Sequence, residues 1–186
     1  MIVNIYSDHI AYTFEDNEHI NIPSVKYLRK KHECLILMAE ARYNGSYRIM
    51  YDLDNILPLN EIAGRMPKGE LVNVFISFIN SVFEVAVNDS LNIRSIDMNY
   101  SRLFFDSTSN QIKYVYLPIN EECDCHDNNP WIKNFKNTVL ILLGYIFKES
   151  RKNYNDAYYT IMNDELSEYD VLKYVLSYDY TSVLSL

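Results

Sequence analysis

The fold is decided by residues 34–53, which read CLILMAEARYNGSYRIMYDL. Two segments rich in apolar residues, 34–43 and 47–53, lie on either side of Asn44-Gly45. Both central positions of a two-residue hairpin turn take positive φ angles, which glycine and asparagine adopt most easily. This stretch therefore predicts two antiparallel strands joined by a tight turn.

The residues before this hairpin predict another hairpin and a short helix. Segments 2–6 and 10–14 are mostly β-branched or aromatic, and the polar residues Ser7-Asp8-His9 separate them. Between the two hairpins, Pro23 follows a polar stretch and precedes several apolar positions, so a short helix is expected from about Ser24.

The residues after the hairpin predict a long amphipathic helix at 71–88. Its apolar residues recur every three or four positions, which places them on one stripe. They are Leu71, Phe75, Phe78, Ile79, Val82, Phe83 and Ala86. Lys68-Gly69-Glu70 is expected as a loop before this helix and Asn88-Asp89-Ser90 as its end. We expect this helix to form the centre of the core.

A second small hairpin is predicted further along the chain. Residues 103–106 and 112–117 are the expected strands, and the polar segment 107–110 connects them. Residues 118–129 are polar and acidic and are expected as an exposed loop.

The last third of the chain is expected to be helical. Residues 130–148 form a second amphipathic pattern, and 155–178 predict one or two further helices. The fold class is therefore α+β, with a small amino-terminal antiparallel sheet followed by a mostly helical lobe with a short hairpin. The expected division is a β-rich lobe at 1–55 and a helical lobe at 56–186, in a single compact unit.

Composition narrows the classes of function. The chain has 186 residues, of which 48% are apolar, and a formal net charge of −8. An acidic protein binds phosphate backbones poorly, so nucleic acid is not an expected partner. The 17 tyrosines indicate half-buried seams or a protein-binding face, because tyrosine joins an apolar ring to a polar hydroxyl.

The sequence predicts a cytoplasmic protein. Three cysteines do not suggest a disulfide framework, and the first residues lack the pattern of a secretory signal. The apolar windows 72–87 and 138–147 are interrupted or too short for a bilayer span of about 20 residues, so no membrane insertion is expected. A place at the inner face of the membrane would require a partner or a further segment.

Cys123-Asp124-Cys125-His126 is the first candidate metal site, because thiolates and imidazoles bind zinc. A structural zinc site has four ligands, and a second pair would have to come from His32 and Cys34. The sequence favours an acidic surface loop that carries thiols, and no metal site is predicted. Whether Cys123, Cys125 and His126 bind a metal is left open.

The other reactive residue types form no pattern of catalysis or cofactor binding. The four histidines carry no signature of a nucleophile–base pair; they are His9, His19, His32 and His126. The four glycines are isolated and cannot form a phosphate-binding loop, so no cofactor is predicted; they are Gly45, Gly64, Gly69 and Gly144.

Charged clusters are interpreted as surface. Arg29-Lys30-Lys31 is expected on the solvated face of a short helix, with a docking patch for an acidic partner as the alternative. The adjacent acids Glu121-Glu122 and Asp164-Glu165 are expected as surface charge and not as an acid–base pair.

The order of the segments resembles that of a protein kinase. Residues 47–53 and 57–62 are similar to the strand, hinge and short helix that join the two kinase lobes. Residues 95–106 are similar to the catalytic loop and its following strand, and 112–118 to the strand that ends at the metal-binding motif. The resemblance covers residues 45–150 and implies a minimal kinase-like fold.

The kinase motifs, compared residue by residue, imply that the chemistry is absent. Asp97 falls where the catalytic aspartate would stand, but Ser95 replaces the histidine and Arg102 the magnesium-binding asparagine. Tyr116-Leu117-Pro118 occupies the Asp-Phe-Gly position, and the glycine-rich loop and strand lysine are missing. Because these groups stabilise the transferred phosphate, the resemblance implies a kinase shape without catalysis.

Two bacterial families share this pattern. The chain resembles the cytosolic pseudokinase domain of EssB/YukC type VII secretion proteins and an uncharacterised domain that precedes forkhead-associated domains, through Tyr51-Asp52-Leu53, residues 96–106 and residues 131–136. The resemblance implies a non-catalytic module in a secretion or signalling assembly. It would bind other proteins or a second copy of itself, with no catalytic, cofactor-binding or metal-binding residues.

Two alternatives are left open by the residues themselves. A degenerate phosphotransferase would use Asp97, the one matched catalytic position, with unconventional partners. A phage or mobile-element protein would have an unrelated α+β fold.

Overall fold

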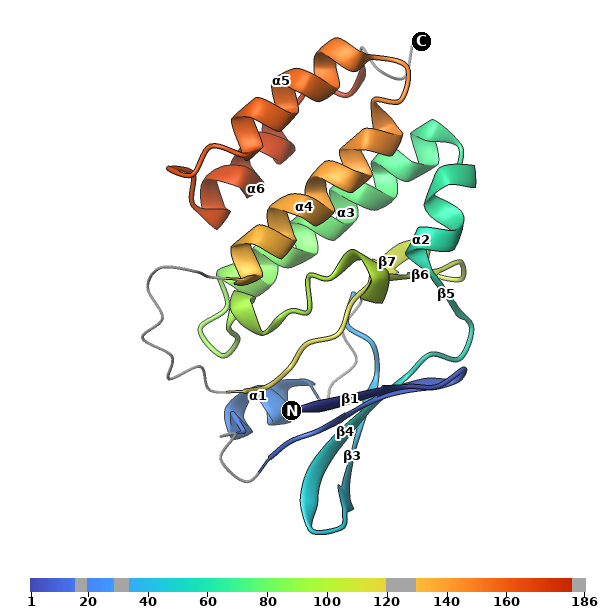
Figure 1. Cartoon of the computed structure of the whole chain (residues 1–186), viewed down its shortest axis with the longest axis vertical. Coiled ribbons are helices and arrows are strands. Elements are labelled where there is room, and N and C mark those ends of the chain that lie inside the picture. The colour runs from blue at the N-terminus through green and yellow to red at the C-terminus, as the bar shows by residue number, and fades with distance from the viewer. Residues whose placement is uncertain (16–19, 29–33, 120–129, 182–186) are drawn as a thin grey trace.

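The structure is a computed structural model that describes residues 1–15, 20–28, 34–119 and 130–181. A four-stranded sheet forms one end of the molecule, and the long helices lie together on one side of it (Figure 1). A second sheet of three short strands lies between the first sheet and the helices (Figure 1). The predicted α+β class is confirmed.

The first sheet contains both predicted amino-terminal hairpins. Its strands are β1 (Ile2–Ile5), β2 (His9–Thr13), β3 (Met38–Tyr43) and β4 (Ser46–Asp52). All neighbours are antiparallel in the order β1-β2-β4-β3, and α1 (Ile22–Leu28) lies between β2 and β3 in sequence. The strand predicted from Cys34 begins only at Met38, because Leu35 forms a parallel bridge with Tyr114 instead.

The turn between β3 and β4 has the backbone that its sequence predicts. Asn44 has φ 51° and Gly45 has φ 86°, so both central residues are in the left-handed region. A side chain at Gly45 would meet nothing within 4 Å, so the backbone angle alone favours glycine there.

Gly45→Ala should therefore destabilise the protein by about 1 kcal/mol, the usual cost of a left-handed non-glycine residue. Gly144→Ala is the matched control, because this glycine is inside a helix and an added Cβ would be 3.5 Å from Tyr154 Cε2, an ordinary contact. Alanine favours helix by up to about 1 kcal/mol, so the control should be neutral or stabilising. Urea unfolding measures both, and equal effects would contradict the argument.

The second sheet joins a predicted hairpin to a strand that the sequence does not reveal. The strands are β5 (Ile56–Pro58), β6 (Phe104–Asp106) and β7 (Gln111–Lys113), in the order β5-β6-β7. The predicted strand at 112–117 ends at Lys113, and beyond it Tyr114 and Tyr116 form only isolated bridges, with Leu35 and Ile96.

The helical part follows the predicted stripes with shifted ends. Its helices are α2 (Leu59–Ile62), α3 (Lys68–Ala86), α4 (Pro130–Ile146), α5 (Arg151–Ile161) and α6 (Glu168–Ser177). Short 3₁₀ turns occur at Ala63–Arg65, Ile93–Ser95 and Tyr100–Arg102. The predicted tail helices are two, and the first of them begins before Asn155.

Lys68-Gly69-Glu70 was predicted as a loop, and this was wrong. These residues form the first turn of α3, because Pro67 precedes them with φ −54° and its carbonyl accepts the Leu71 amide at 3.0 Å. Proline favours the start of a helix, because its fixed φ angle suits the first turn and its missing amide is not needed there. At its other end α3 stops at Ala86, two residues before the predicted end.

Two hydrophobic clusters form the core. The larger surrounds α3 and α4, where Phe75, Phe78 and Phe135 are fully buried. The smaller lies under the first sheet and also includes Phe104 and Val115 from the later part of the chain. α3 is long and apolar enough to cross a membrane by length and composition alone, but its apolar residues are the ones that form the larger cluster.

Candidate functional site

The segment that carries Asp97 is shaped by two asparagine caps. The Asn92 side chain accepts the Arg94 amide at 2.9 Å and opens the turn Ile93–Ser95. The Asn99 side chain accepts the Ser101 amide at 3.1 Å and opens the turn Tyr100–Arg102. Asparagine favours such positions because its side-chain oxygen replaces a missing backbone acceptor.

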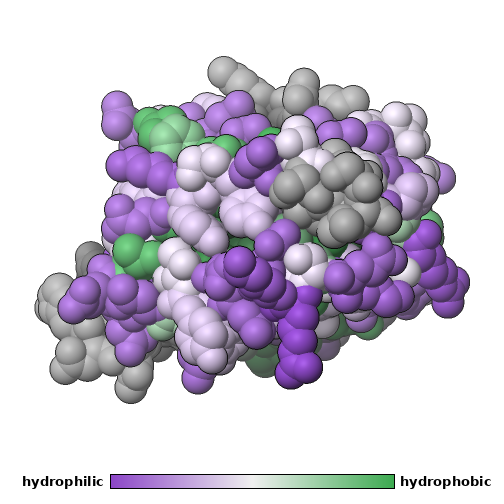
Figure 2. All heavy atoms as spheres, turned by 90° about the horizontal axis from the view of Figure 1, so that it is seen from above, coloured by the Kyte–Doolittle hydropathy of each residue, from purple (hydrophilic) through white to green (hydrophobic). Residues whose placement is uncertain are grey.

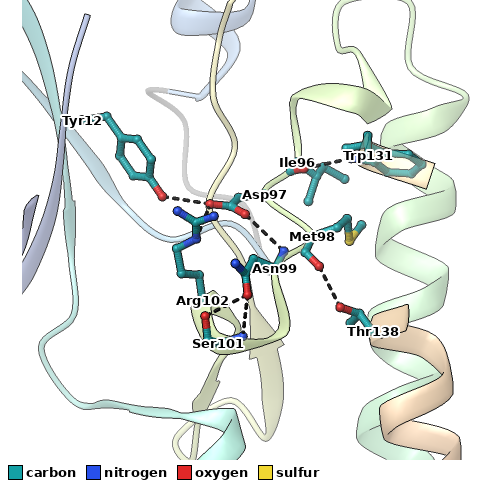
Figure 3. A network of polar contacts seen from close by, with 9 residues as sticks. All are labelled: Tyr12, Ile96, Asp97, Met98, Asn99, Ser101, Arg102, Trp131 and Thr138. Carbon is teal, nitrogen blue, oxygen red and sulfur yellow. Dashed lines mark hydrogen bonds and ion pairs between the residues drawn. The ribbon is translucent and has the colours of Figure 1, made fainter. Parts of the chain in front are cut away.

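α4 fixes the backbone on both sides of Asp97 (Figure 3). The Trp131 indole donates to the Ile96 carbonyl at 2.9 Å, and the Thr138 hydroxyl donates to the Met98 carbonyl at 2.7 Å. The Asp97 amide itself donates to the Val115 carbonyl at 2.9 Å. These contacts place the Asp97 side chain between the two sheets.

The Asp97 carboxylate is already bound by other groups of the chain (Figure 3). Its Oδ2 atom lies 2.8 Å from Arg102 Nε and accepts the Tyr12 hydroxyl at 3.0 Å. Its Oδ1 atom accepts the Asn99 amide at 3.1 Å. The side chain is 8% exposed, so Asp97 forms a buried ion pair that ties the first sheet to the rest of the molecule.

Tyr12 brings the first sheet to this network. It is fully buried, and its ring meets that of Tyr51 edge to face with the centroids 5.7 Å apart. Burial raises the pKa of the Tyr12 hydroxyl well above its usual value, and the charge of Asp97 adds to the shift. Next to it the Tyr51 hydroxyl donates to the carbonyl of Tyr116.

We expect the stability of the protein to fall above about pH 10, where tyrosines of an unfolded chain lose their protons. The raised pKa keeps Tyr12 protonated in the folded state, so the unfolded state then binds fewer protons. Each such tyrosine lowers the free energy of unfolding by about 1.4 kcal/mol per pH unit. Tyr51 and Tyr114 have raised pKa values for the same reason, burial.

Tyr12→Phe should therefore reduce, but not abolish, this pH dependence, as measured by urea unfolding between about pH 9 and pH 11. A slope identical to that of the unmodified protein would show that Tyr12 does not titrate as proposed.

The positions that would complete a kinase site carry other groups. Ser95 is 3% exposed, and its hydroxyl has no hydrogen-bond partner among the described residues. Tyr116 is buried, and its hydroxyl accepts the Asn92 amide at 2.7 Å. In the resemblance to a kinase, Ser95 stands in place of the histidine and Tyr116 in place of the metal-binding aspartate, and neither carries the side chain that the motif has there.

The hollow beside Arg102 is small. It has a volume of about 230 Å³ and is bordered by apolar residues of β1, β2 and the segment after β4, among them Ile5, Ile10 and Leu53. Sites for drug-sized ligands usually measure about 300–1,000 Å³. A larger hollow of about 540 Å³ lies elsewhere, along the polar face of α3 at Asn73, Asn80 and Glu84.

The structure brings together two residues that the sequence singled out, Asp97 and Arg102. Tyr12, Trp131 and Thr138 were missed as members of the site, although the period-two pattern of residues 10–14 indicates that Tyr12 points inward. Asp164-Glu165 lies exposed between α5 and α6, as expected.

The remaining candidates form no site within the described residues, or lie outside them. His9 stacks on Tyr6 and contacts Asp8, and Cys34 is buried. Among the described residues no three metal-binding side chains come together. Several predicted candidates lie outside the described residues; they are His19, Arg29-Lys30-Lys31, His32, Glu121-Glu122, Cys123, Cys125 and His126.

The chain is similar in structure to a known protein but is assigned to no family. No family model matches the chain, and no curated protein matches it. Among solved structures the chain is similar to a Staphylococcus aureus ESSB cytoplasmic fragment, with 13% identity and a TM-score of 0.49 over 96% of each chain. At this level of similarity, the function has to be inferred from the residues of the chain itself.

Proposed function

We propose that this protein is a non-catalytic, pseudokinase-like module that works by binding other proteins in the cytoplasm. The observation that carries the proposal is the state of Asp97, the one matched catalytic position. Its carboxylate is paired with Arg102 at 2.8 Å and hydrogen-bonded by Tyr12 at 3.0 Å. Both partners occupy Oδ2, so neither a substrate proton nor a metal ion can reach that oxygen without displacing one of them.

The surroundings of Asp97 do not fit magnesium and a nucleotide. Phosphoryl transfer relies on metal ions that neutralise the phosphate charge, and a kinase holds them with an asparagine and an aspartate. Here the cation Arg102 and the segment Tyr116-Leu117 stand at those positions. The neighbouring hollow of about 230 Å³ is also smaller than usual ligand sites.

The interaction role is supported by exposed tyrosines. Tyr43 is 55% exposed and Tyr159 is 75% exposed, and tyrosine is enriched in protein interfaces. A place in a type VII secretion or signalling assembly is the more specific part of the proposal, and it rests on the resemblance of residues 51–53, 96–106 and 131–136.

Titration calorimetry with magnesium and ATP tests the proposal on the full chain. We expect no binding at millimolar nucleotide and no transfer of labelled phosphate to the protein or to a general acceptor. Phosphate transfer that is lost in Asp97→Asn, but kept in the exposed control Asp89→Asn, would establish the phosphotransferase alternative instead.

A second experiment tests the place in a secretion assembly. Deletion of the gene in its bacterium should stop type VII export, and the Asp97→Asn protein should restore it.

A further inference from the structure

The first sheet has one face that no described helix covers. Side chains alternate along a strand, so Tyr12, Ile49 and Tyr51 point toward the buried cluster while Ala11 and Met50 point to the opposite side. The long helices α3–α6 all lie on the first of these sides (Figure 1), and α1 is hydrogen-bonded to the segment directly after α3, through Ser24 to the Ser90 carbonyl and through Tyr27 to Asn88. Within the described residues, the opposite face is therefore left without a helical layer.

The opposite face of the first sheet, its outer face, contains a hollow of about 310 Å³ where β2 begins and β4 ends. Its apolar lining consists of Leu37, Met38, Ala39 and Met50. Leu37 is 60% exposed, and the short side chain of Ala39 leaves room beside it. The helical end of the molecule differs, since its surface is mainly hydrophilic with small separate apolar groups (Figure 2).

The rim of the hollow is acidic. Asp8, Asp52 and Asp54 supply three carboxylates, and the one basic group among the lining residues is the His9 ring, 2.8 Å from Asp8. Hydrogen bonds from two backbone amides hold the rim in place. The Asp54 amide donates to Asp52 Oδ1 at 2.9 Å, and the Leu53 amide donates to the Asp8 carbonyl at 2.8 Å.

β3, which borders the hollow, is an edge strand of the first sheet. The Asp52 amide donates to the Leu37 carbonyl, so residues 37, 39, 41 and 43 bond to β4. The backbone groups of the alternate residues Met38 and Arg42 point away from β4. An edge of this kind can accept a further strand from another protein.

We propose that this face binds a basic, extended segment of a partner protein as an added strand along β3. Apolar side chains of that segment fill the hollow, and its lysines or arginines contact Asp52 and Asp54. The same carboxylates repel anionic membranes and nucleic acids, which leaves a basic peptide as the complementary partner. This inference rests on the proposed interaction role and adds the surface and the chemistry of the partner.

A fluorescent nine-residue peptide of alternating lysine and leucine tests the proposal by anisotropy on the full chain. We expect it to bind more tightly than peptides that alternate glutamate with leucine or lysine with serine. Asp52→Asn with Asp54→Asn should weaken binding about fivefold or more, from the loss of two charge contacts. Asp164→Asn with Glu165→Gln removes the same charge at another exposed place and should change binding less than about twofold.

Arg42 separates strand pairing from simple charge attraction. Arg42→Ala and Arg42→Pro both remove a positive charge, so attraction alone predicts equal or tighter binding by both. Proline also removes the amide that points away from β4, while the pairing with β4 is kept. We therefore expect Arg42→Pro to bind the peptide about fivefold more weakly than Arg42→Ala, the loss of about one hydrogen bond.

Leu37 tests the apolar part of the contact. Leu37→Ser should weaken binding, whereas Val87→Ser, at a residue that is also 60% exposed, should not. If the peptide does not bind, or if the paired variants have equal effects, the proposed docking surface is wrong. The non-catalytic proposal would not be affected by that result. Phosphate transfer would overturn the non-catalytic proposal whatever the peptide does.

Discussion

Arg102→Met should destabilise the protein by about 3 kcal/mol, because it leaves the carboxylate of Asp97 buried without its cation. The Asp97 side chain is 8% exposed and the Arg102 side chain 25%, so water can replace little of the lost interaction. The Tyr12 hydroxyl and the Asn99 amide remain as donors, but neither carries a charge. Urea unfolding of purified protein measures the loss.

The double variant Arg102→Met with Asp97→Asn identifies the cause. Once the charge of Asp97 is gone, removal of Arg102 leaves no buried ion, so the double variant should be more stable than Arg102→Met alone. Arg94→Met is the matched control. Arg94 contacts Glu168 at 3.8 Å with a side chain that is 47% exposed, and such pairs contribute about 0.5 kcal/mol or less. Additive effects in the double variant would refute the coupling.

Phe78→Ala should cost about 4 kcal/mol, the usual effect of truncating a fully buried phenylalanine. Phe78 lies on α3 inside the larger cluster, and its ring meets Tyr114 edge to face with the centroids 6.0 Å apart. Because small domains are stable by only about 5–15 kcal/mol, this loss is between about a quarter and most of the total stability.

Phe78→Leu keeps the measurement possible if the alanine variant does not fold. It retains most of the apolar volume and should lose clearly less stability than Phe78→Ala. Val87→Ala, at an exposed position directly after α3, should change the free energy of unfolding by less than about 0.5 kcal/mol. A loss at Val87 equal to that at Phe78 would mean that α3 is not the centre of the core.

The parts of the fold that depend on nearby residues could be predicted from the sequence. The turn at Asn44-Gly45 is specified by two adjacent residues, and the stripes of α3 and α4 repeat over several turns. β5 was missed because it has three residues and forms only by pairing with β6, a strand much further along the chain. Leu35 was assigned to the wrong pairing for the same reason, since its partner is Tyr114.

The sequence identifies the members of the candidate site that lie in one segment, but it does not show how the site is assembled. Asp97 and Arg102 could be singled out because residues 95–106 resemble a kinase catalytic loop, but no periodic pattern places an arginine on an aspartate five residues earlier. Tyr12 reaches Asp97 across 85 residues of sequence, and Trp131 reaches Ile96 across 35. Contacts of this length depend on how the sheets and α4 pack together, which a single sequence does not reveal.

The smaller hydrophobic cluster has a consequence for how the protein is made. Its strands β2 and β4 are synthesised early, but Phe104 and Val115 complete the cluster, and Tyr51 donates to a carbonyl 65 residues further on. On the ribosome, translation of that interval takes several seconds at about 5–20 residues per second. During that time the inner face of the first sheet lacks the residues that later cover it, so this half of the fold is completed only after residue 115 has left the ribosome.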